Sequence, residues 1–483
     1  MTFLSSVMTT LVAVLSPVDT NAMADTMAMP TKITLEQAVT IALEESPTVK
    51  VADMEISKTG YARKGTYSAL FPSIDGSGAF QRTIKKQVMY MDFDMSALGG
   101  GSIPGAGAGT GSESGAESQT TPSTTAAPKS KGGIEVGRWN TWSAGVSAAM
   151  PLVNAQLWES LKISDMDVEL AVEKARSSRI ETVTQVKQAY FSILLAKEAF
   201  KVYKSVYENA MENLDLIQKK YNVQKASDLE LARAKTSLAN AIPNVYDAEN
   251  AIVLGLWQLK AVMGVDLDVE IDVEGSLSDY ADRMLLDLSM TQDPSLDQNS
   301  TMKQLAIQAE QLASAIKVQK RACLPSLNLA FSYSLNAMEN DFVFSEYQWS
   351  PHSYVGLSLS IPIFAGGKRH NAIKQSKVQA AQFQEQQAST ERQLRISVRQ
   401  YANTMETAVK SYGSASSAVE TARKAYEIAR KSYEVGRNTL TDLNDAQLAL
   451  TQAELTVSQA VYNFVNAKSA LEGVLGYDFV VNE

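Results

Sequence analysis

Residues 433–478 read YEVGRNTLTDLNDAQLALTQAELTVSQAVYNFVNAKSALEGVLGYD and carry a seven-residue apolar repeat. Two sets of positions recur every seven residues, the second following the first by three: Leu443, Leu450, Val457, Phe464 and Leu471, then Ala446, Ala453, Ala460, Ala467 and Val474. This spacing is typical of a coiled-coil seam. The alanines allow a partner helix to approach closely, which favours a packed tube of helices over an isolated two-stranded zipper. The alternative for this segment is an amphipathic helix in an ordinary bundle.

An earlier segment is similar to this one. KKYNVQKASDLELARAKTSL at residues 219–238 aligns with RKSYEVGRNTLTDLNDAQLAL at residues 430–450, with Asp228 opposite Asp442 and the alanines four residues further on opposite each other. In this alignment the first turn is two residues shorter than the second. Two shorter matches, AAMPLV with LSIPIF and VMGVD with VLGYD, recur at offsets of 211 and 212 residues. Two structural repeats therefore fill the chain.

The composition excludes several classes of protein. The chain has 483 residues, 45% of them hydrophobic, and a formal net charge of −9, so we predict no nucleic-acid partner. A single cysteine, Cys323, leaves no internal disulfide and no cysteine-based zinc site. The two histidines, His352 and His370, form no catalytic constellation with other side chains. We therefore predict that the protein is not an enzyme and that it has no metal site and no cofactor.

The N-terminal residues resemble an export signal. FLSSVMTTLVAVL is followed by NAMA, in which Ala22 and Ala24 fit the small-x-small cleavage pattern. After this segment no apolar run is long enough to predict a membrane-spanning helix. The predicted organisation is a signal peptide at 1–24, a first repeat at 25–265, a small mixed equatorial linker domain at 266–299, a second repeat at 300–478 and a C-terminal tail at 479–483.

Each repeat is predicted to contain a helix, a β-hairpin, a very long helix, a turn and a return helix. Thr34 and Gln37 form a capping box for one helix that extends to about residue 67. Its counterpart spans about residues 300–321. Pro72 and Pro325 follow these helices and favour extended backbone before the hairpins.

The long helices are predicted at about residues 155–221 and 368–435. They contain no proline, and at ~1.5 Å per residue each measures ~100 Å. The return helices end near Val262 and Val474. The first of them contains Pro243, which should kink the helix or divide it into two.

The second hairpin has the clearest strand pattern. Apolar and small polar residues alternate in LNLAFSYSL at 327–335 and in VGLSLSIPI at 355–363, each about nine residues long, as a tilted membrane strand requires. The predicted lipid-facing residues are Leu327, Leu329, Phe331, Tyr333, Val355, Leu357, Leu359 and Ile361. Tyr347, Trp349 and Tyr354 are candidate interface aromatics.

The first hairpin has a weaker pattern, with an apolar face formed by Ile74, Phe80, Trp142, Val146 and Met150. Its strands are separated by a tract rich in glycine, serine, threonine and alanine. This tract includes residues 96–133, which we expect to form a disordered loop.

Four strands cannot close a membrane barrel by themselves. Open edges in lipid would leave backbone N–H and C=O groups unpaired, so several copies must share one barrel. Two copies would provide eight strands and a filled interior, whereas three would provide twelve strands and a lumen. The small polar residues on the inner faces favour the trimer.

The sequence resembles the TolC family of outer-membrane efflux and secretion channels. The resemblance rests on ITLEQAVTIALEESP, LFPSI, CLPSL, IPIFAGGKR and YEVGRNTLTDLNDAQ, in this order and with this duplication. It implies a mainly α fold with a membrane β-barrel portion: a homotrimer with a twelve-strand barrel in the outer membrane and an α-helical tunnel in the periplasm of a Gram-negative bacterium. It also implies a periplasmic adaptor protein and an inner-membrane transporter as partners.

The family resemblance assigns a periplasmic gate to Asp442 and Asp445. They lie three residues apart at the start of the return helix, and threefold symmetry would gather six carboxylates around one axis. The alternative is that Asp442 only caps its helix with Thr439. The resemblance assigns adaptor-facing tips to Val435, Gly436, Arg437, Val223, Gln224, Ser227 and Asp228.

The predicted function is that of an exit duct for a tripartite efflux pump or a type I secretion system. A passive duct leaves the choice of cargo to the pump. The alternative is a structural or adhesive coiled-coil protein of the envelope that has no conducting lumen.

Overall fold

The computed structural model describes residues 32–89, 134–289 and 295–477. The predicted signal peptide and C-terminal tail lie outside these ranges, as does the predicted loop at 96–133. The chain divides into two compact units, a helical unit and a sheet unit. The helical unit comprises Met1–Lys64, Glu159–Gln319 and His370–Glu483, and the sheet unit comprises Gly65–Trp158 and Lys320–Arg369.

The first helix of the first repeat is divided, and the prediction of one continuous helix is wrong. α1 (Leu35–Glu45) begins with the predicted capping box between Thr34 and Gln37, and α2 (Pro47–Ser68) follows after a single residue. Ser46 has φ −57° and ψ 127°, which is outside the helical region. Proline at position 47 explains the break, because its ring clashes with helical backbone in the preceding residue. The counterpart α7 (Ser300–Arg321) has the predicted bounds.

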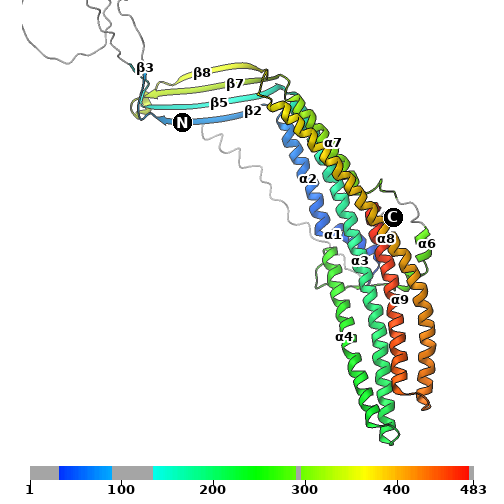
Figure 1. Ribbon diagram of the computed structural model, residues 1–483. Helices are drawn as coiled ribbons and strands as arrows, with labels where there is room; N and C mark the ends of the chain where they lie inside the picture. The colour runs from blue at the N-terminus through cyan, green and yellow to red at the C-terminus, as the bar shows by residue number, and fades with distance from the viewer. Residues whose placement is uncertain (1–31, 90–133, 290–294, 478–483) are drawn as a thin grey trace, which may run out of the picture. The chain divides into compact units, whose positions relative to one another are not determined.

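Two long helical hairpins follow the prediction within two residues. α3 (Ala155–Asn222) is followed by the return helix α4 (Asp228–Met263), and α8 (Lys368–Glu434) is followed by α9 (Leu440–Leu475). In Figure 1 the two helices of each hairpin lie side by side. Pro243 lies inside α4 without ending it, so of the two predicted effects, a kink or a division of the helix, the division is wrong.

The two hairpins match at a constant offset of 212 residues, which corrects the alignment made from the sequence. Both connecting segments, 223–227 and 435–439, contain five residues, so neither turn is shorter. The position opposite Asp442 is therefore Glu230 and not Asp228. The alignment from the sequence paired two aspartates by placing a two-residue gap in the first turn, and the structure has no such gap.

The same offset aligns the seams of α4 and α9. The small residues Ala234, Ala241, Ala248 and Gly255 are buried, and the residues 212 positions later are all alanine. In α9 most of the predicted seam is buried, including Leu443, Leu450, Phe464 and Leu471. The alanine-rich seam thus forms the inner face of each return helix, where small side chains permit close approach.

The segment between the repeats packs against the middle of α3. β6 (Asp272–Val273) pairs in parallel with β1 (Lys32–Ile33), and α5 (Ser278–Ala281) and α6 (Met284–Ser289) follow. These elements share one hydrophobic core with α1, α3, α4, α8 and α9. Tyr190 of α3 lies in this core with 1% of its surface exposed.

The sheet unit contains a four-stranded antiparallel sheet in the order β2-β5-β7-β8 (Figure 1). Its strands are β2 (Ser73–Arg82), β5 (Asn140–Val153), β7 (Ser326–Glu339) and β8 (Ser350–Ser360). β3 (Gln87–Met89) pairs with β4 (Ile134–Val136) in a separate ribbon. The two strands of the second hairpin are longer than predicted, with 14 and 11 residues. β8 also ends at Ser360 and not at residue 363, because Pro362 cannot donate a hydrogen bond to a neighbouring strand.

Within the described ranges, no helix is both long enough and apolar enough to cross a bilayer.

Candidate functional site

The four-stranded sheet has one apolar face and one face of small polar residues. Pairing in register places Leu329 opposite both Met150 and Leu357, and Phe331 opposite both Ala148 and Val355. The apolar face contains Ile74, Phe80, Trp142, Val146, Met150, Leu327, Leu329, Phe331, Tyr333, Leu335, Val355, Leu357 and Leu359. Seven of the eight residues predicted to face lipid lie here, whereas Ile361 follows the end of β8. Their contact with lipid stays a prediction.

Aromatic side chains gather where the apolar face meets the β7–β8 connection. The ring centroids of Phe80 and Trp142 are 4.4 Å apart, and Phe344 lies 4.9 Å from Trp142 and 4.9 Å from Tyr347. The buried Tyr347 hydroxyl donates to the carbonyl oxygen of Asp341 at 2.6 Å.

The three candidate interface aromatics do not share one face. Tyr347 joins the aromatic cluster, and Trp349 is exposed beside β8. Tyr354, in contrast, pairs with Ser332 on the polar face. Tyr354 lies one residue before Val355, the first apolar position of the predicted strand. Successive side chains of a strand point to opposite faces, so Tyr354 belongs to the polar face.

The two helix tips have the same backbone geometry. The N–H of Gln224 donates to the carbonyl of Tyr221 at 2.9 Å, and the N–H of Gly436 donates to the carbonyl of Tyr433 at 3.0 Å. Gln224 has φ 58° and Gly436 has φ 74°. Glycine adopts this left-handed conformation readily in the second repeat, and a glutamine adopts it in the first. The predicted tip residues Val223 and Val435 are exposed.

Capping boxes begin both return helices. Ser227 and Glu230 form the box of α4, and Thr439 and Asp442 form the box of α9. The Thr439 hydroxyl donates to Asp442 Oδ2 at 2.7 Å, and the Thr439 backbone N–H donates to the same oxygen at 2.9 Å. These hydrogen bonds, that from the hydroxyl first, hold the pKa of the Asp442 carboxyl below its ordinary value. Asp442 thus has a capping role whatever its role in a gate.

Asp445 lies one turn after Asp442, and both side chains are exposed. The position 212 residues earlier is Arg233, whose guanidinium donates to the Thr441 hydroxyl at 3.3 Å. The second repeat therefore provides two carboxylates, whereas the first provides Glu230 and an arginine. The tips differ in charge although their backbones agree.

A small hydrophobic core joins the two hairpins near their tips. It contains Ile217, Ala234, Ala429, Tyr433, Leu440 and Leu443, which come from all four helices. The Lys220 ammonium lies 4.8 Å from the centre of the Tyr433 ring, and Arg430 pairs with Glu212 at 3.2 Å. In the first turn, the Tyr221 hydroxyl donates to Asp228 at 2.8 Å. This hydrogen bond raises the pKa of Tyr221.

We expect the replacement of Gln224 by glycine to stabilise the first tip. A non-glycine residue in the left-handed region costs about 1–2 kcal/mol, which glycine avoids. Slower hydrogen–deuterium exchange of the amides around residues 220–230 would show the gain. The reciprocal variant, Gly436→Gln, should accelerate exchange in the second tip. Unchanged exchange in both variants would contradict the assigned conformations.

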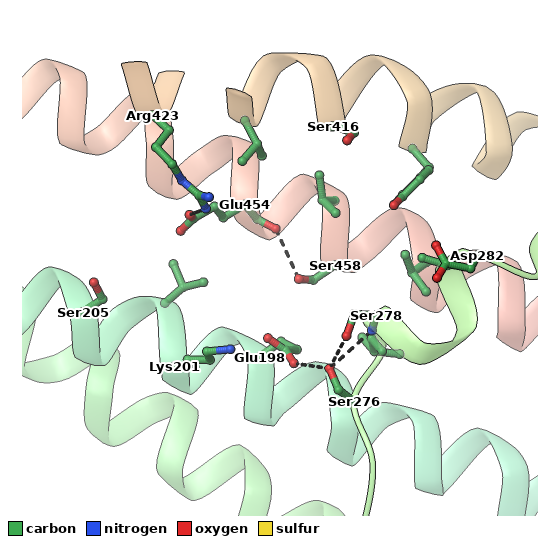
Figure 2. A pocket seen from close by; sticks show the side chains of 17 residues that line it. Glu198, Lys201, Ser205, Ser276, Ser278, Asp282, Ser416, Arg423, Glu454 and Ser458 are labelled. Atoms are coloured by element: carbon green, nitrogen blue, oxygen red, sulfur yellow. Dashed lines mark hydrogen bonds and ion pairs between the residues drawn. The ribbon is translucent and has the colours of Figure 1, made fainter. Parts of the chain in front are cut away.

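A polar cavity of about 580 Å³ lies between α3, the segment before α5, α8 and α9 (Figure 2). Glu198 accepts a hydrogen bond from the Ser276 hydroxyl at 2.7 Å, and Arg423 pairs with Glu454 at 2.9 Å. Lys201 also lines the cavity. With Asp282, the lining contains three acidic and two basic side chains, so groups of both charges border the space.

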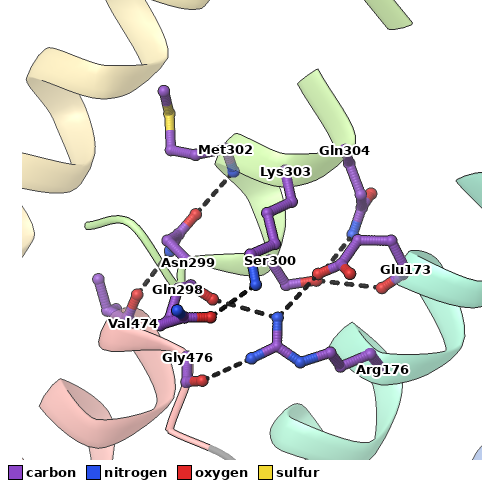
Figure 3. Close-up of polar contacts among 10 residues, drawn as sticks. All are labelled: Glu173, Arg176, Gln298, Asn299, Ser300, Met302, Lys303, Gln304, Val474 and Gly476. Atoms are coloured by element: carbon purple, nitrogen blue, oxygen red, sulfur yellow. Dashed lines mark hydrogen bonds and ion pairs between the residues drawn. The ribbon is translucent and has the colours of Figure 1, made fainter. Parts of the chain in front are cut away.

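A cluster of hydrogen bonds around Arg176 connects α3 with the start of α7 and the end of α9 (Figure 3). The guanidinium donates to Glu173 at 3.0 Å, to the carbonyl of Gln298 at 3.2 Å and to the carbonyl of Gly476 at 2.8 Å. Asn299 caps α7 by accepting from the N–H of Met302 at 2.8 Å. The sequence did not indicate this cluster, because backbone carbonyls leave no residue pattern.

In the part of the chain that the structure describes, no three histidine, cysteine, aspartate or glutamate side chains are grouped as a metal site would require.

The family model for outer membrane efflux proteins matches residues 38–265 and 293–477, which is most of the chain. The chain belongs to the outer membrane efflux protein family. This confirms the resemblance noted in the sequence and places the protein in the outer membrane.

Solved structures of outer membrane proteins share the fold at low sequence identity. The Campylobacter jejuni CmeC outer membrane channel is 17% identical, with a TM-score of 0.65 over 92% of this chain and 85% of that chain. Vibrio cholerae VceC is 14% identical, with a TM-score of 0.65 over 92% and 97% of the two chains. The open state of the Neisseria gonorrhoeae MtrE channel is 17% identical, with a TM-score of 0.64 over 92% and 88%.

Two curated relatives match in sequence over part of their length. Outer membrane protein TolC of Escherichia coli K12 is 22% identical over 282 residues, which is 56% of each chain. The alkaline protease secretion protein AprF of Pseudomonas aeruginosa is 23% identical over 243 residues, which is 49% of each chain. The matched region thus spans about half the length of these relatives. Their names describe membrane and secretion proteins and not enzymes.

Proposed function

We propose that three copies of this chain form an exit duct in the outer membrane for a tripartite efflux pump or a type I secretion system. In this proposal the sheets close a twelve-strand barrel, and the long helices form a tunnel in the periplasm. The tips at residues 223–227 and 435–439 meet a periplasmic adaptor protein, which connects the duct to an inner-membrane transporter.

The observation that carries the proposal is the four-stranded sheet with two unpaired edges and two unlike faces. Among the residues that the structure describes, β2 and β8 are each paired on one side only. Because β2 and β8 run in opposite directions, β8 of one copy can pair with β2 of the next in the same antiparallel manner. Closure would satisfy the edge groups, place the apolar face in lipid and direct the small polar residues toward a lumen.

The oligomer and its conductance test this proposal. Protein purified in a mild detergent should have the mass of three chains, and it should form ion-conducting pores in a planar lipid bilayer. A trimer that never conducts would favour the structural or adhesive envelope protein. A water-soluble monomer would contradict both candidates.

A gate at the tips is part of the proposal, with Asp442 and Asp445 as its carboxylates. Exposed carboxylates that three subunits bring to one axis would attract cations and repel anions. We expect Asp445→Asn to reduce the preference for potassium over chloride severalfold. The asparagine variant leaves the Thr439–Asp442 capping box intact, so the helix start stays folded. The measurement is the reversal potential of single channels under a salt gradient.

Glu230→Gln is the matched control for the gate. It removes the only carboxylate that the first repeat places opposite a gate residue, at the position that corresponds to Asp442, and glutamine can still complete the Ser227 capping box. If only the second-repeat carboxylates form the gate, this variant should leave the reversal potential close to that of the wild type. Equal shifts in both variants would remove the special role of Asp445.

A further inference from the structure

The polar face of the sheet is nearly free of charge. Its four strands lie wholly within the described residues, so every ionisable side chain on it can be counted. Strand parity and register assign three to this face: Asp75 on β2, and His352 and Tyr354 on β8. The other charged strand residues, Arg82 and Glu339, have the opposite parity and share a row with Asn140.

Hydroxyl groups surround Asp75 on this face. Ser73 and Ser77 lie two residues away on the same strand, and Ser147 lies directly opposite on β5. The same row continues through Ser332 to Tyr354. The side chain of Asp75 is exposed and makes no ion pair with the described residues. On this face, the neighbours of the Asp75 carboxylate are therefore residues with hydroxyl groups and not charged residues.

We infer that Asp75 determines the ion selectivity of the sheet portion of the duct, by forming a ring of three carboxylates that favours cations. The inference rests on the proposed trimeric duct, in which this face lines the lumen. Asp75 is the only aspartate or glutamate on this face of the sheet, and the same face of the four strands contains no lysine or arginine. One uncompensated negative charge per subunit then dominates the local potential, because no cation on the same face offsets it.

Charge substitution at Asp75 tests the inference. Single channels are measured at pH 8 under a potassium chloride gradient, with the trimer of each variant confirmed by its mass in detergent. Asp75→Asn should reduce the preference for potassium over chloride severalfold, and Asp75→Lys should invert it. Both effects should persist in the Asp445→Asn background, since the two sites lie in different units of the chain.

A relocated charge provides the matched control. Ser77 has the same parity as Asp75 on β2, so the double variant Asp75→Asn with Ser77→Asp returns one carboxylate to the same face. It should recover most of the lost preference. A trimeric Asp75→Lys channel that conducts with the wild-type reversal potential would overturn the inference and leave the proposed duct intact. Wild-type trimers that form no pore would instead overturn the proposed function itself.

Discussion

Replacement of Gly476 by alanine is expected to reduce the free energy of unfolding of the helical unit by about 3 kcal/mol or more. Gly476 follows α9 in the left-handed conformation, with φ 77°. A methyl group there would overlap the carbonyl oxygen of Gln298 and lie 2.8 Å from the carbonyl carbon. Backbone strain and overlap with a rigid backbone therefore add. The measurement is the midpoint of thermal unfolding in detergent, followed by circular dichroism.

Gly436→Ala is the control for Gly476→Ala, because it introduces the backbone strain without the steric overlap. Gly436 has a similar φ of 74°, but a methyl group there would meet no atom within 4 Å. Its replacement should therefore cost only the strain of the left-handed conformation, about 1–2 kcal/mol. If both variants lowered the unfolding midpoint equally, the close packing of Gly476 against Gln298 would be wrong.

Replacement of Tyr190 by phenylalanine should reduce the free energy of unfolding by about 1–3 kcal/mol. The Tyr190 hydroxyl donates to the carbonyl oxygen of Glu274 and, at 3.2 Å, to that of Ile33. The Ile33 carbonyl keeps a second donor, the N–H of Glu274, whereas the Glu274 carbonyl would lose its donor. The loss would loosen the attachment of β1 and β6 to α3.

Tyr280→Phe is the control for Tyr190. The Tyr280 ring packs edge-on against Phe191, with centroids 5.1 Å apart, and phenylalanine preserves this contact. The control should change the thermal midpoint less than Tyr190→Phe. A larger loss in the control would place the important contact elsewhere.

Because the Tyr190 hydroxyl is buried, we also expect the free energy of unfolding to fall in alkaline solution. Burial, and then the proximity of Tyr280, raise the pKa of Tyr190 above its ordinary value. A group whose pKa is raised on folding stabilises the protein fully below its unfolded pKa, here about 10, and progressively less above it. Stability should therefore fall as the pH rises above about 10, and less steeply in Tyr190→Phe. Parallel pH profiles of the two proteins would contradict this role.

The parts of the fold that could be predicted depend on regular spacing. The seven-residue repeat from Leu443 to Leu471 and the absence of proline fixed the long helices within two residues of their observed bounds. Alternation from Leu327 to Leu335 correctly indicated one apolar face. These patterns are visible because each contact is repeated many times along one element.

Single-residue effects caused the errors. The break at Ser46 comes from the restriction that Pro47 places on the preceding backbone, and the end of β8 comes from the missing N–H of Pro362. Identical residues suggested the match of Asp228 with Asp442, but helix length pairs Asp442 with Glu230. The Arg176 cluster and the cavity beside Glu198 join distant segments, and no periodic pattern in the sequence represents such contacts.

The two return helices have the same length, 36 residues each, and their turns contain five residues each. One inserted residue would advance a helix by about 1.5 Å and rotate everything beyond it by about 100°. An insertion in one hairpin alone would therefore leave the two tips uneven and turn its alanine stripe away from its neighbour. Level tips therefore require any change in the length of one hairpin to be matched in the other, and inward alanine stripes require each change to be a whole heptad.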